Sequence, residues 1–160
     1  MGRGFTASEA QLKPDPKFGD KTLSRFINCI MQDGKKTRAQ RVVYMALEEI
    51  EQRLPDDSED TAIDVFRKAI DNVRPNVEVR SKRVGGANYQ VPMQVKPSRK
   101  QSLAFRWIIN AARAEKGKPM HLRLGRELME AYRGEGRAMN TRDQTHRMAE
   151  ANKAFAHFAW

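Results

Sequence analysis

Three arginines, Arg99, Arg106 and Arg113, lie seven residues apart in this 160-residue chain. In a helix this spacing drifts by only about 20° per step, so the three guanidinium groups form one stripe. The residues between them are largely apolar from Leu103 to Ile109, so we expect protein to cover the rest of this helix. A row of guanidinium groups suits phosphate oxygens, which accept paired hydrogen bonds from them. A solvated helix edge is the alternative, and neighbouring cations in the sequence count against it.

A second group of cations, Lys35, Lys36, Arg38 and Arg41, lies at the start of a predicted helix that carries glutamates near its end. This order opposes the helix dipole, which favours the reverse arrangement by ~0.3–1 kcal/mol per charge near a terminus. Helix stability therefore does not explain it, although ordinary surface variation remains an alternative. A helix start rich in cations would offer phosphate both side-chain charge and free backbone N–H groups.

A third group, Arg80, Lys82 and Arg83, lies in a stretch in which apolar and polar residues alternate. Two glycines at positions 85 and 86 divide this stretch, which predicts a β-hairpin over residues 75–96. Proline at position 92 fits only a strand with a free edge. Near the tip the cations occupy both faces of the ribbon and leave no apolar face to pack, so we expect the tip to project from the body.

The charge of the chain is concentrated in one segment. The formal net charge is +10, yet residues 74–118 alone hold 11 Lys and Arg against two Asp and Glu. Such an excess favours a polyanionic partner, and nucleic acid is the first candidate. No apolar run approaches the roughly 20 residues of a membrane-spanning helix. The N-terminal segment resembles neither a signal nor a transit peptide, so we predict a cytoplasmic protein.

Catalytic and metal chemistry find little support in the sequence. The single cysteine, Cys29, allows no intramolecular disulfide, and its place in an apolar helical pattern predicts a buried core thiol. Residues 34–37, Gly-Lys-Lys-Thr, lack the upstream glycine spacing of a phosphate-binding loop. The three histidines have no partner at a metal-ligand spacing. We therefore predict no enzyme, no metal and no cofactor.

Apolar periodicity predicts a mainly α fold, a bundle of about six helices with one protruding two-stranded β-hairpin. The chain is expected to form a single RNA-binding domain over residues 1–160, with an extended N-terminal arm over 1–19. Local capping signals place the helix starts. The expected helices are 20–33; 37–54, with a Thr37 and Gln40 capping box; one from a Ser58 cap to Pro75; one from a Ser98 and Gln101 capping box to about Glu115; 121–133; and one after Thr141 and Gln144.

Several segments resemble the small-subunit ribosomal protein seven family. They are residues 26–36, which begin Phe-Ile-Asn and end Asp-Gly-Lys-Lys, with Val42, Val43 and Ala46; residues 74–92, which include Arg-Val-Gly-Gly-Ala-Asn-Tyr-Gln-Val-Pro; residues 101–104; and residues 147–152. The resemblance covers nearly the whole chain at bacterial-type length. Members of this family often begin with a dense basic run, whereas residues 1–19 hold only three cations, so binding should depend more on the helices and hairpin.

The resemblance implies a structural constituent of the small ribosomal subunit. It implies a primary protein of the 3′ major domain of the ribosomal RNA that nucleates head assembly, with a hairpin near the exit site for transfer RNA and contact with the platform protein eleven. Carried onto this chain, the RNA contacts would be Lys35, Lys36, Arg38, Arg41, Arg74, Arg80, Lys82, Arg83, Arg99, Arg106 and Arg113. These residues lie in the segments that charge and spacing select, and the resemblance adds Arg74.

Two other classes of basic protein are alternatives to an RNA scaffold. A DNA-architectural protein with a basic β-arm would carry an apolar wedge or a proline at the hairpin tip, where this chain has Gly85 and Gly86. An enzyme that acts on nucleic acid would need an acidic metal site, and we find none in the sequence. A scaffold that contacts phosphates and reads RNA shape is the remaining interpretation.

Overall fold

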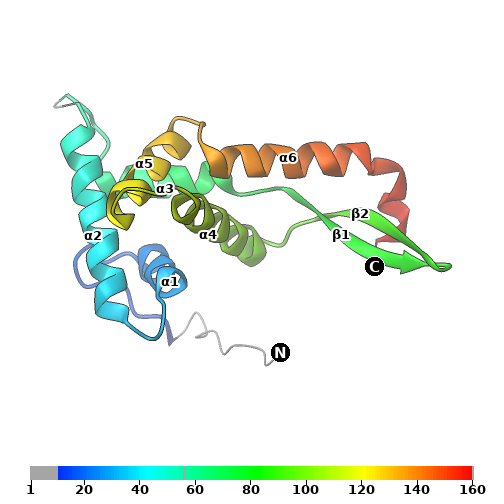
Figure 1. The fold of residues 1–160 in the computed structure, drawn as a ribbon, viewed down its shortest axis with the longest axis horizontal. Helices are drawn as coiled ribbons and strands as arrows, with labels where there is room; N and C mark the ends of the chain where they lie inside the picture. Colours follow the sequence, from blue (N-terminus) through cyan, green and yellow to red (C-terminus); the bar gives the residue numbers. More distant parts are fainter. Residues whose placement is uncertain (1–10, 56, 160) are drawn as a thin grey trace.

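The computed structural model describes residues 11–55 and 57–159, which fold into six α-helices, one β-hairpin and a C-terminal 3-10 helix (Figure 1). The elements follow one another as α1 (Lys21–Ile30), α2 (Lys36–Arg53), α3 (Ala62–Val73), β1 (Val77–Val84), β2 (Ala87–Gln94), α4 (Pro97–Ala114), α5 (Met120–Tyr132), α6 (Arg137–Ala151) and η2 (Lys153–Phe158). The predicted fold class, a mainly helical bundle with one two-stranded hairpin, is confirmed.

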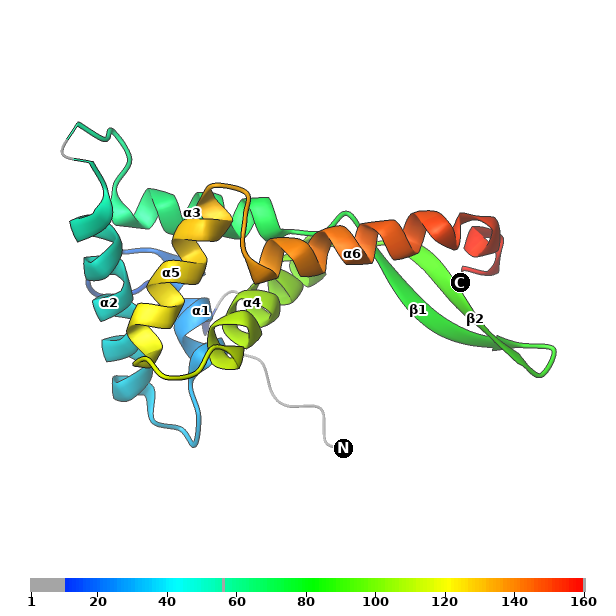
Figure 2. The same ribbon diagram turned by 45° about the horizontal axis from the view of Figure 1, so that its top comes forward.

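The molecule is elongated, with a helical body at one end and the hairpin at the other. Helices α1 to α5 form the body, while β1 and β2 extend from it and α6 runs out in the same direction (Figures 1 and 2). The η2 segment turns back from the end of α6 toward the strands. None of the described helices is long and apolar enough to cross a membrane.

Three phenylalanines hold the centre of the helical body together. Phe26 of α1 lies edge-on to Phe66 of α3 and to Phe105 of α4, with ring centroids 5.3 Å apart in both pairs. All three side chains are fully buried, and edge-to-face packing adds to the free energy of burying their area. Because Phe105 anchors α4 through this face, the arginine at the next position, Arg106, is directed to the surface, where it is exposed.

Helices α2 and α5 approach closely because α5 carries a glycine at their contact. A Cβ atom at Gly125 would lie only 3.2 Å from the carbonyl oxygen of Ala46. This tight contact fixes the first turns of α5 beside α2. It matters for function because those turns carry Arg123, whose side chain lines a surface pocket.

The hairpin has the geometry that its sequence predicts. The strands pair antiparallel from Val77 opposite Gln94 to Val84 opposite Ala87. Gly85 and Gly86 join them with φ angles of +57° and +87°, which residues other than glycine adopt only rarely. With two strands in the sheet each strand keeps a free edge, so the prediction for the proline is confirmed.

Four of the predicted helix caps, those of α2, α3, α4 and α6, are wrong, because the local sequence patterns on which they rest do not determine the caps. Helix α2 begins at Lys36 and α4 at Pro97, and neither has a side-chain cap, so Thr37 and Ser98 lie inside helices. Helix α3 is capped by Thr61, in a box with Asp64, whereas Ser58 forms a turn before it. The first helix also ends at Ile30, before the predicted residue 33.

The start of α6 shows why such patterns fail. This helix begins at Arg137, ahead of the predicted cap at Thr141, and no side chain at its N-cap position satisfies its first N–H groups. Glu127 of α5 does so instead, because its buried carboxylate accepts a 2.8 Å hydrogen bond from the N–H of Ala138. Burial raises the pKa of Glu127, while this hydrogen bond opposes the rise. A cap supplied by another helix leaves no trace in the local sequence.

Cys29 is exposed on α1, so the prediction of a buried core thiol is wrong. Ile27 and Ile30, on either side of it, face the core, but Cys29 lies on the other side of the helix. Partial burial of its sulfur raises the pKa of the thiol, and the charges of Arg25 and Arg106 oppose this rise. Cys29 therefore lies beside the arginine stripe.

Of the N-terminal arm expected over residues 1–19, residues 1–10 lie outside the described part of the chain. In the remainder, Asp15 is buried and accepts hydrogen bonds from the N–H groups of Lys17 and Phe18. Tyr44 of α2 donates its hydroxyl to the same carboxylate at 2.7 Å. Residues 15–18 are thus held against α2.

Candidate nucleic-acid interface

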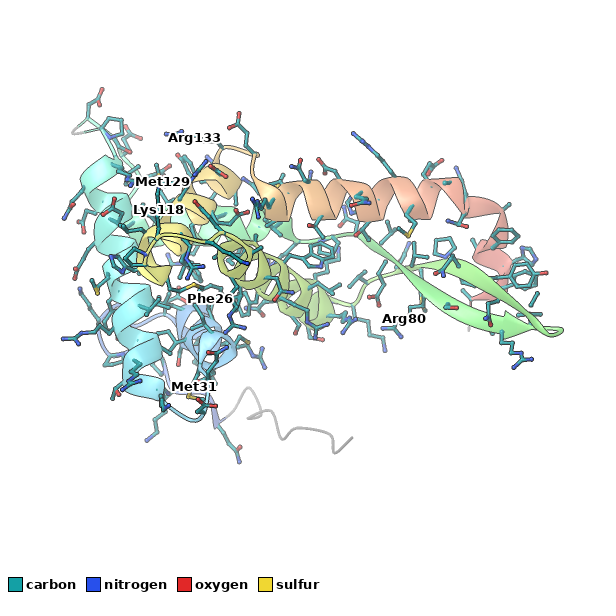
Figure 3. All side chains as sticks on the ribbon, in the orientation of Figure 1. Phe26, Met31, Arg80, Lys118, Met129 and Arg133 are labelled. Carbon is teal, nitrogen blue, oxygen red and sulfur yellow. The ribbon has the colours of Figure 1, made fainter. Side chains whose placement is uncertain are left out.

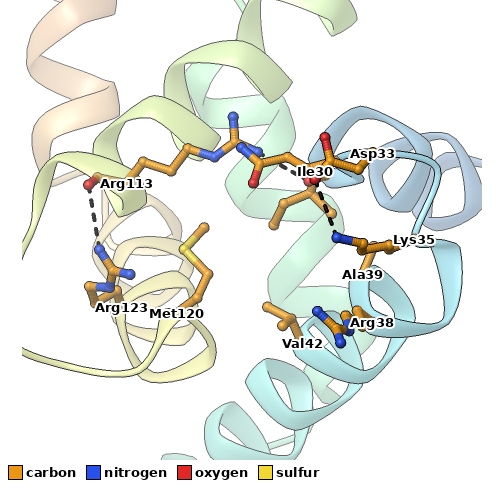
Figure 4. Close-up of a pocket in the computed structure, with 10 residues that line it drawn as sticks. Ile30, Asp33, Lys35, Arg38, Ala39, Val42, Arg113, Met120 and Arg123 are labelled. Atoms are coloured by element: carbon orange, nitrogen blue, oxygen red, sulfur yellow. Dashed lines mark hydrogen bonds and ion pairs between the residues drawn. The ribbon is translucent and has the colours of Figure 1, made fainter.

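Two of the three cation groups meet at one pocket. A cavity of about 460 Å³ lies where the end of α1, the start of α2, the end of α4 and the start of α5 converge. Its cationic lining comes from Lys35 just before α2, Arg38 of α2, Arg113 of α4 and Arg123 of α5 (Figure 4). The helix-start group and one end of the arginine stripe, far apart in the sequence, therefore form a single surface, which we call the basic pocket.

Backbone carbonyls orient two of these guanidinium groups. Arg113 donates to the carbonyl of Ile30 at 3.1 Å, which joins α4 to the end of α1. Arg123 donates to the carbonyls of Arg113 and Glu115. A neutral carbonyl fixes the position of a cation without cancelling its charge, so both groups are held in place for an anion.

The rim of the basic pocket is more loosely held. The ammonium of Lys35 lies 3.4 Å from the carboxylate of Asp33, and both side chains are largely exposed. Such surface pairs contribute little free energy and are readily exchanged. Arg38 is exposed and has no ion pair within residues 11–55 and 57–159. The rim cations can therefore turn toward a ligand at small cost.

The other end of the arginine stripe is partly neutralised by the protein itself. Arg99 of α4 lies 3.2 Å from the carboxylate of Glu78, and Arg80 of the same strand as Glu78 lies 2.6 Å from its second oxygen. Figure 3 labels Arg80 at the base of the hairpin. Glu78 is buried, with 8% of its surface exposed. One carboxylate balances one of two arginines, so this cluster, the hairpin base, keeps one net positive charge.

Near the hairpin tip one face of the ribbon is packed, contrary to expectation. Tyr89 of β2 lies against Phe155 and Phe158, with ring centroids 5.2 and 5.0 Å apart. Lys82 donates to the carbonyl of Phe158 at 2.7 Å. The end of the chain thus covers the side of the hairpin that we expected to be bare, while Arg83 stays exposed.

A histidine joins the start of the hairpin to α6. The Nε2 atom of His146 accepts a 3.1 Å hydrogen bond from the N–H of Asn76, whose side chain accepts another from Lys100. Burial and the charge of Arg142 lower the pKa of His146, and Asp143 opposes this. His146 must be neutral at Nε2 to accept, so this contact belongs to the neutral imidazole.

The remaining predicted residues lie apart from these clusters. Lys36 and Arg41 are exposed on α2 and have no ion pair with any described residue. Arg106 is exposed midway along α4. Arg74, at the end of α3, lies 2.7 Å from Asp71. Its Nε atom is buried and has no hydrogen-bond partner in the described structure.

Sequence reasoning missed Arg123. It lies in a segment where acidic and basic residues mix, so the charge count gave no reason to select it. Only the contact between α4 and α5 brings it to the basic pocket. Within the described residues, no group of three or more His, Cys, Asp or Glu side chains could hold a metal ion.

A scan against protein-family models identifies the chain by residues 2–153, which match the model described as ribosomal protein S7p/S5e. The chain belongs to this family. Similar proteins include the small ribosomal subunit protein uS7 of Rhodopirellula baltica, 58% identical over the full length of both chains. The protein of the same name from Magnetococcus marinus is 52% identical over the full length of both. That of Chromobacterium violaceum is 52% identical over 99% of each chain.

Membership of this family confirms several predictions. The chain is a structural constituent of the small ribosomal subunit, and its family consists of ribosomal structural proteins, not enzymes. Its partners are therefore ribosomal RNA and other ribosomal components, and its place is the ribosome. Ribosomal RNA is therefore a polyanionic partner for the cations of this protein.

Proposed function

We propose that this chain is a primary binding protein of the 3′ major domain of small-subunit ribosomal RNA and nucleates assembly of the subunit head in the cytoplasm. One observation carries the proposal. Lys35, Arg38 and Arg113, from elements distant in sequence, line one pocket together with Arg123. Preformed clusters of cations from several rigid helices suit a structured polyanion better than a flexible one.

The proposed mechanism is electrostatic and geometric. Lysine and arginine side chains displace counterions from RNA phosphates, so affinity falls as salt rises. The packed core around Phe26, Phe66 and Phe105 keeps the cation clusters at fixed separations, which allows the body to hold RNA helices in register. Duplex RNA hides its base edges in a deep groove, so shape should dominate recognition.

The full set of proposed RNA contacts keeps the predicted residues. They are Lys35, Lys36, Arg38 and Arg41 at and after the N-cap of α2; Arg74, Arg80, Lys82 and Arg83 around β1; and Arg99, Arg106 and Arg113 on α4. Ion pairs of Arg74, Arg80 and Arg99 within the protein favour a smaller contribution from these three. Arg123 joins the set on the strength of its position in the basic pocket.

The hairpin end is proposed to lie near the exit site for transfer RNA and beside the platform protein eleven. The resemblance to the family supports this placement. So does the shape of the molecule, because the hairpin and α6 extend well beyond the helical body and could reach a second partner (Figure 2).

Binding of the purified chain to transcripts of separate ribosomal RNA domains tests the proposal. We expect the 3′ major domain to bind at least about tenfold more tightly than a 5′ domain transcript of equal length. The logarithm of affinity should fall linearly with the logarithm of salt concentration. Equal affinity for both transcripts at every salt concentration would contradict specific binding to the 3′ major domain.

A further inference from the structure

The lining of the basic pocket includes side chains that the binding of a phosphate does not require. Besides its cations it is lined by four apolar side chains, Ile30, Ala39, Val42 and Met120, drawn from three helices. An isolated phosphate requires positive charge and N–H donors, and an apolar floor adds nothing to its binding. Ile30 and Ala39 belong to the hydrophobic core and Val42 and Met120 pack against it, so the floor is an uncovered edge of the core that an apolar part of a ligand can cover.

The polar groups of the pocket are also of two kinds. Asp33 and Gln32 line it beside the cations, and the carboxylate of Asp33 can only accept hydrogen bonds at neutral pH. An acceptor would repel a bare anion but suits the amino and ring N–H groups of a nucleobase. The guanidinium planes of Arg113 and Arg123, held by backbone carbonyls, offer flat surfaces on which a base can stack.

From this combination we infer that the basic pocket holds a single unpaired nucleotide turned out of the RNA helix. Its base lies on the apolar floor formed by Val42 and Met120, and its phosphates meet Lys35 and Arg38 at the rim. The volume of about 460 Å³ falls in the range of pockets that bury small organic ligands. The inference rests on the proposed function, which supplies RNA as the partner, and goes beyond it by naming what enters the pocket.

Such a site would give the protein a means of recognising RNA that charge alone does not provide. Phosphate contacts position a protein but carry no sequence information. An extruded nucleotide occurs only at bulges, loops and junctions. A pocket for one nucleotide would therefore direct a basic protein to a junction in preference to continuous duplex.

Two duplex RNAs test the inference, one fully paired and one identical except for a single bulged nucleotide at its centre. We expect the full chain to prefer the bulged RNA by about tenfold, the effect of stacking one base on a protein surface. The variant Val42→Phe fills the floor and should abolish the preference while keeping the cations. Met45→Phe is the matched control, since Met45 is exposed on the same helix and lies outside the pocket.

A second measurement needs no variant, which matters because Val42 also packs against the core. NMR spectra of the methyl groups of Val42 and Met120 in the full chain should shift on addition of adenosine monophosphate through the ring current of the base. Inorganic phosphate should leave these methyl signals unchanged. A poly-glutamate peptide should also leave them unchanged, and a shift with the peptide but not with the nucleotide would assign the pocket to an acidic protein segment.

The outcomes separate the two proposals. If the unmodified chain binds both duplexes equally and the nucleotide leaves the methyl signals unchanged, the nucleotide pocket is wrong and RNA binding stands. Loss of preference in both Val42→Phe and Met45→Phe would also overturn it. If no RNA of either design is bound, and no transcript either, the proposed function itself fails.

Discussion

The basic pocket, with four cations, and the hairpin base, with two, hold their positive charges differently. In the pocket, Arg113 and Arg123 are bound by neutral carbonyls, which fix them and leave their charge intact. At the hairpin base, Arg80 and Arg99 share the buried carboxylate of Glu78. The difference shows that a count of positive residues overstates the charge available to a partner wherever the fold supplies its own counter-charge.

The largest effect is expected from the rim of the basic pocket. The double variant Lys35→Gln and Arg38→Gln should weaken binding to the 3′ major domain by about 30-fold, roughly 1 kcal/mol for each lost phosphate contact. The slope of affinity against salt should fall by about 0.7 to 0.9 per contact. The control pair Lys21→Gln and Arg133→Gln removes one lysine and one arginine from exposed sites that have no ion pair in the described structure. An equal loss there would reduce the pocket to a nonspecific part of the surface.

A smaller loss is expected from the hairpin. Changing Arg80, Lys82 and Arg83 together to alanine should weaken binding by about tenfold and flatten the salt dependence, since part of this charge is already balanced by Glu78. Titration with the same transcript measures both quantities, and circular dichroism checks the fold. Unchanged affinity and slope would remove the hairpin from the RNA contact. A loss greater than that of the pocket variant would reverse the order of the two regions.

Removing the carboxylate at the hairpin base should have the opposite effect and increase the affinity for RNA. In Glu78→Gln no carboxylate balances the charges of Arg80 and Arg99. We therefore expect RNA to bind about threefold more tightly, with a steeper dependence of affinity on salt. Glu51→Gln, at an exposed position of α2, makes the same change in net charge without releasing an arginine. If both variants gain equally, net charge explains the gain and the pairing at Glu78 does not limit binding.

The smallest effect concerns the attachment of the hairpin to α6. The pKa of His146 is lower in the folded protein than its ordinary value of 6.5, because burial and Arg142 disfavour its charged form. The unfolded chain then binds the proton more readily, so this contribution to stability is complete above about pH 6.5 and is lost as pH falls through the lowered folded pKa. The other charged groups nearby are Asp143, Glu150, Lys153 and Lys100.

Thermal unfolding between pH 7.5 and 5 measures this effect. His146→Gln keeps an acceptor for the N–H of Asn76 but does not titrate, so the melting temperature of the unmodified chain should fall more steeply with acid than that of the variant. Parallel curves for the two proteins would show that protonation of His146 does not weaken the contact between α6 and the hairpin.

Periodicity predicted the elements well, because each helix buries a regular stripe and the hairpin alternates. The failures share a cause, which is that the deciding contact comes from elsewhere in the chain. The carboxylate of Glu127 caps α6 from another helix, and the aromatic rings of Phe155 and Phe158 cover Tyr89 from the end of the chain. For the same reason sequence spacing selected Arg113 but not Arg123, since only the packing of α5 brings the latter to the pocket.

Chemical modification of arginines in the free and RNA-bound protein tests most directly whether the exposed arginines without ion pairs contact RNA. With phenylglyoxal and mass spectrometry, we expect saturating 3′ major domain RNA to protect Arg38 and Arg106, which have no ion pair in the described structure, and to leave Arg53 and Arg133 as reactive as before. If Arg38 and Arg106 react at the same rate in the saturated complex as in the free protein, these surfaces do not contact RNA.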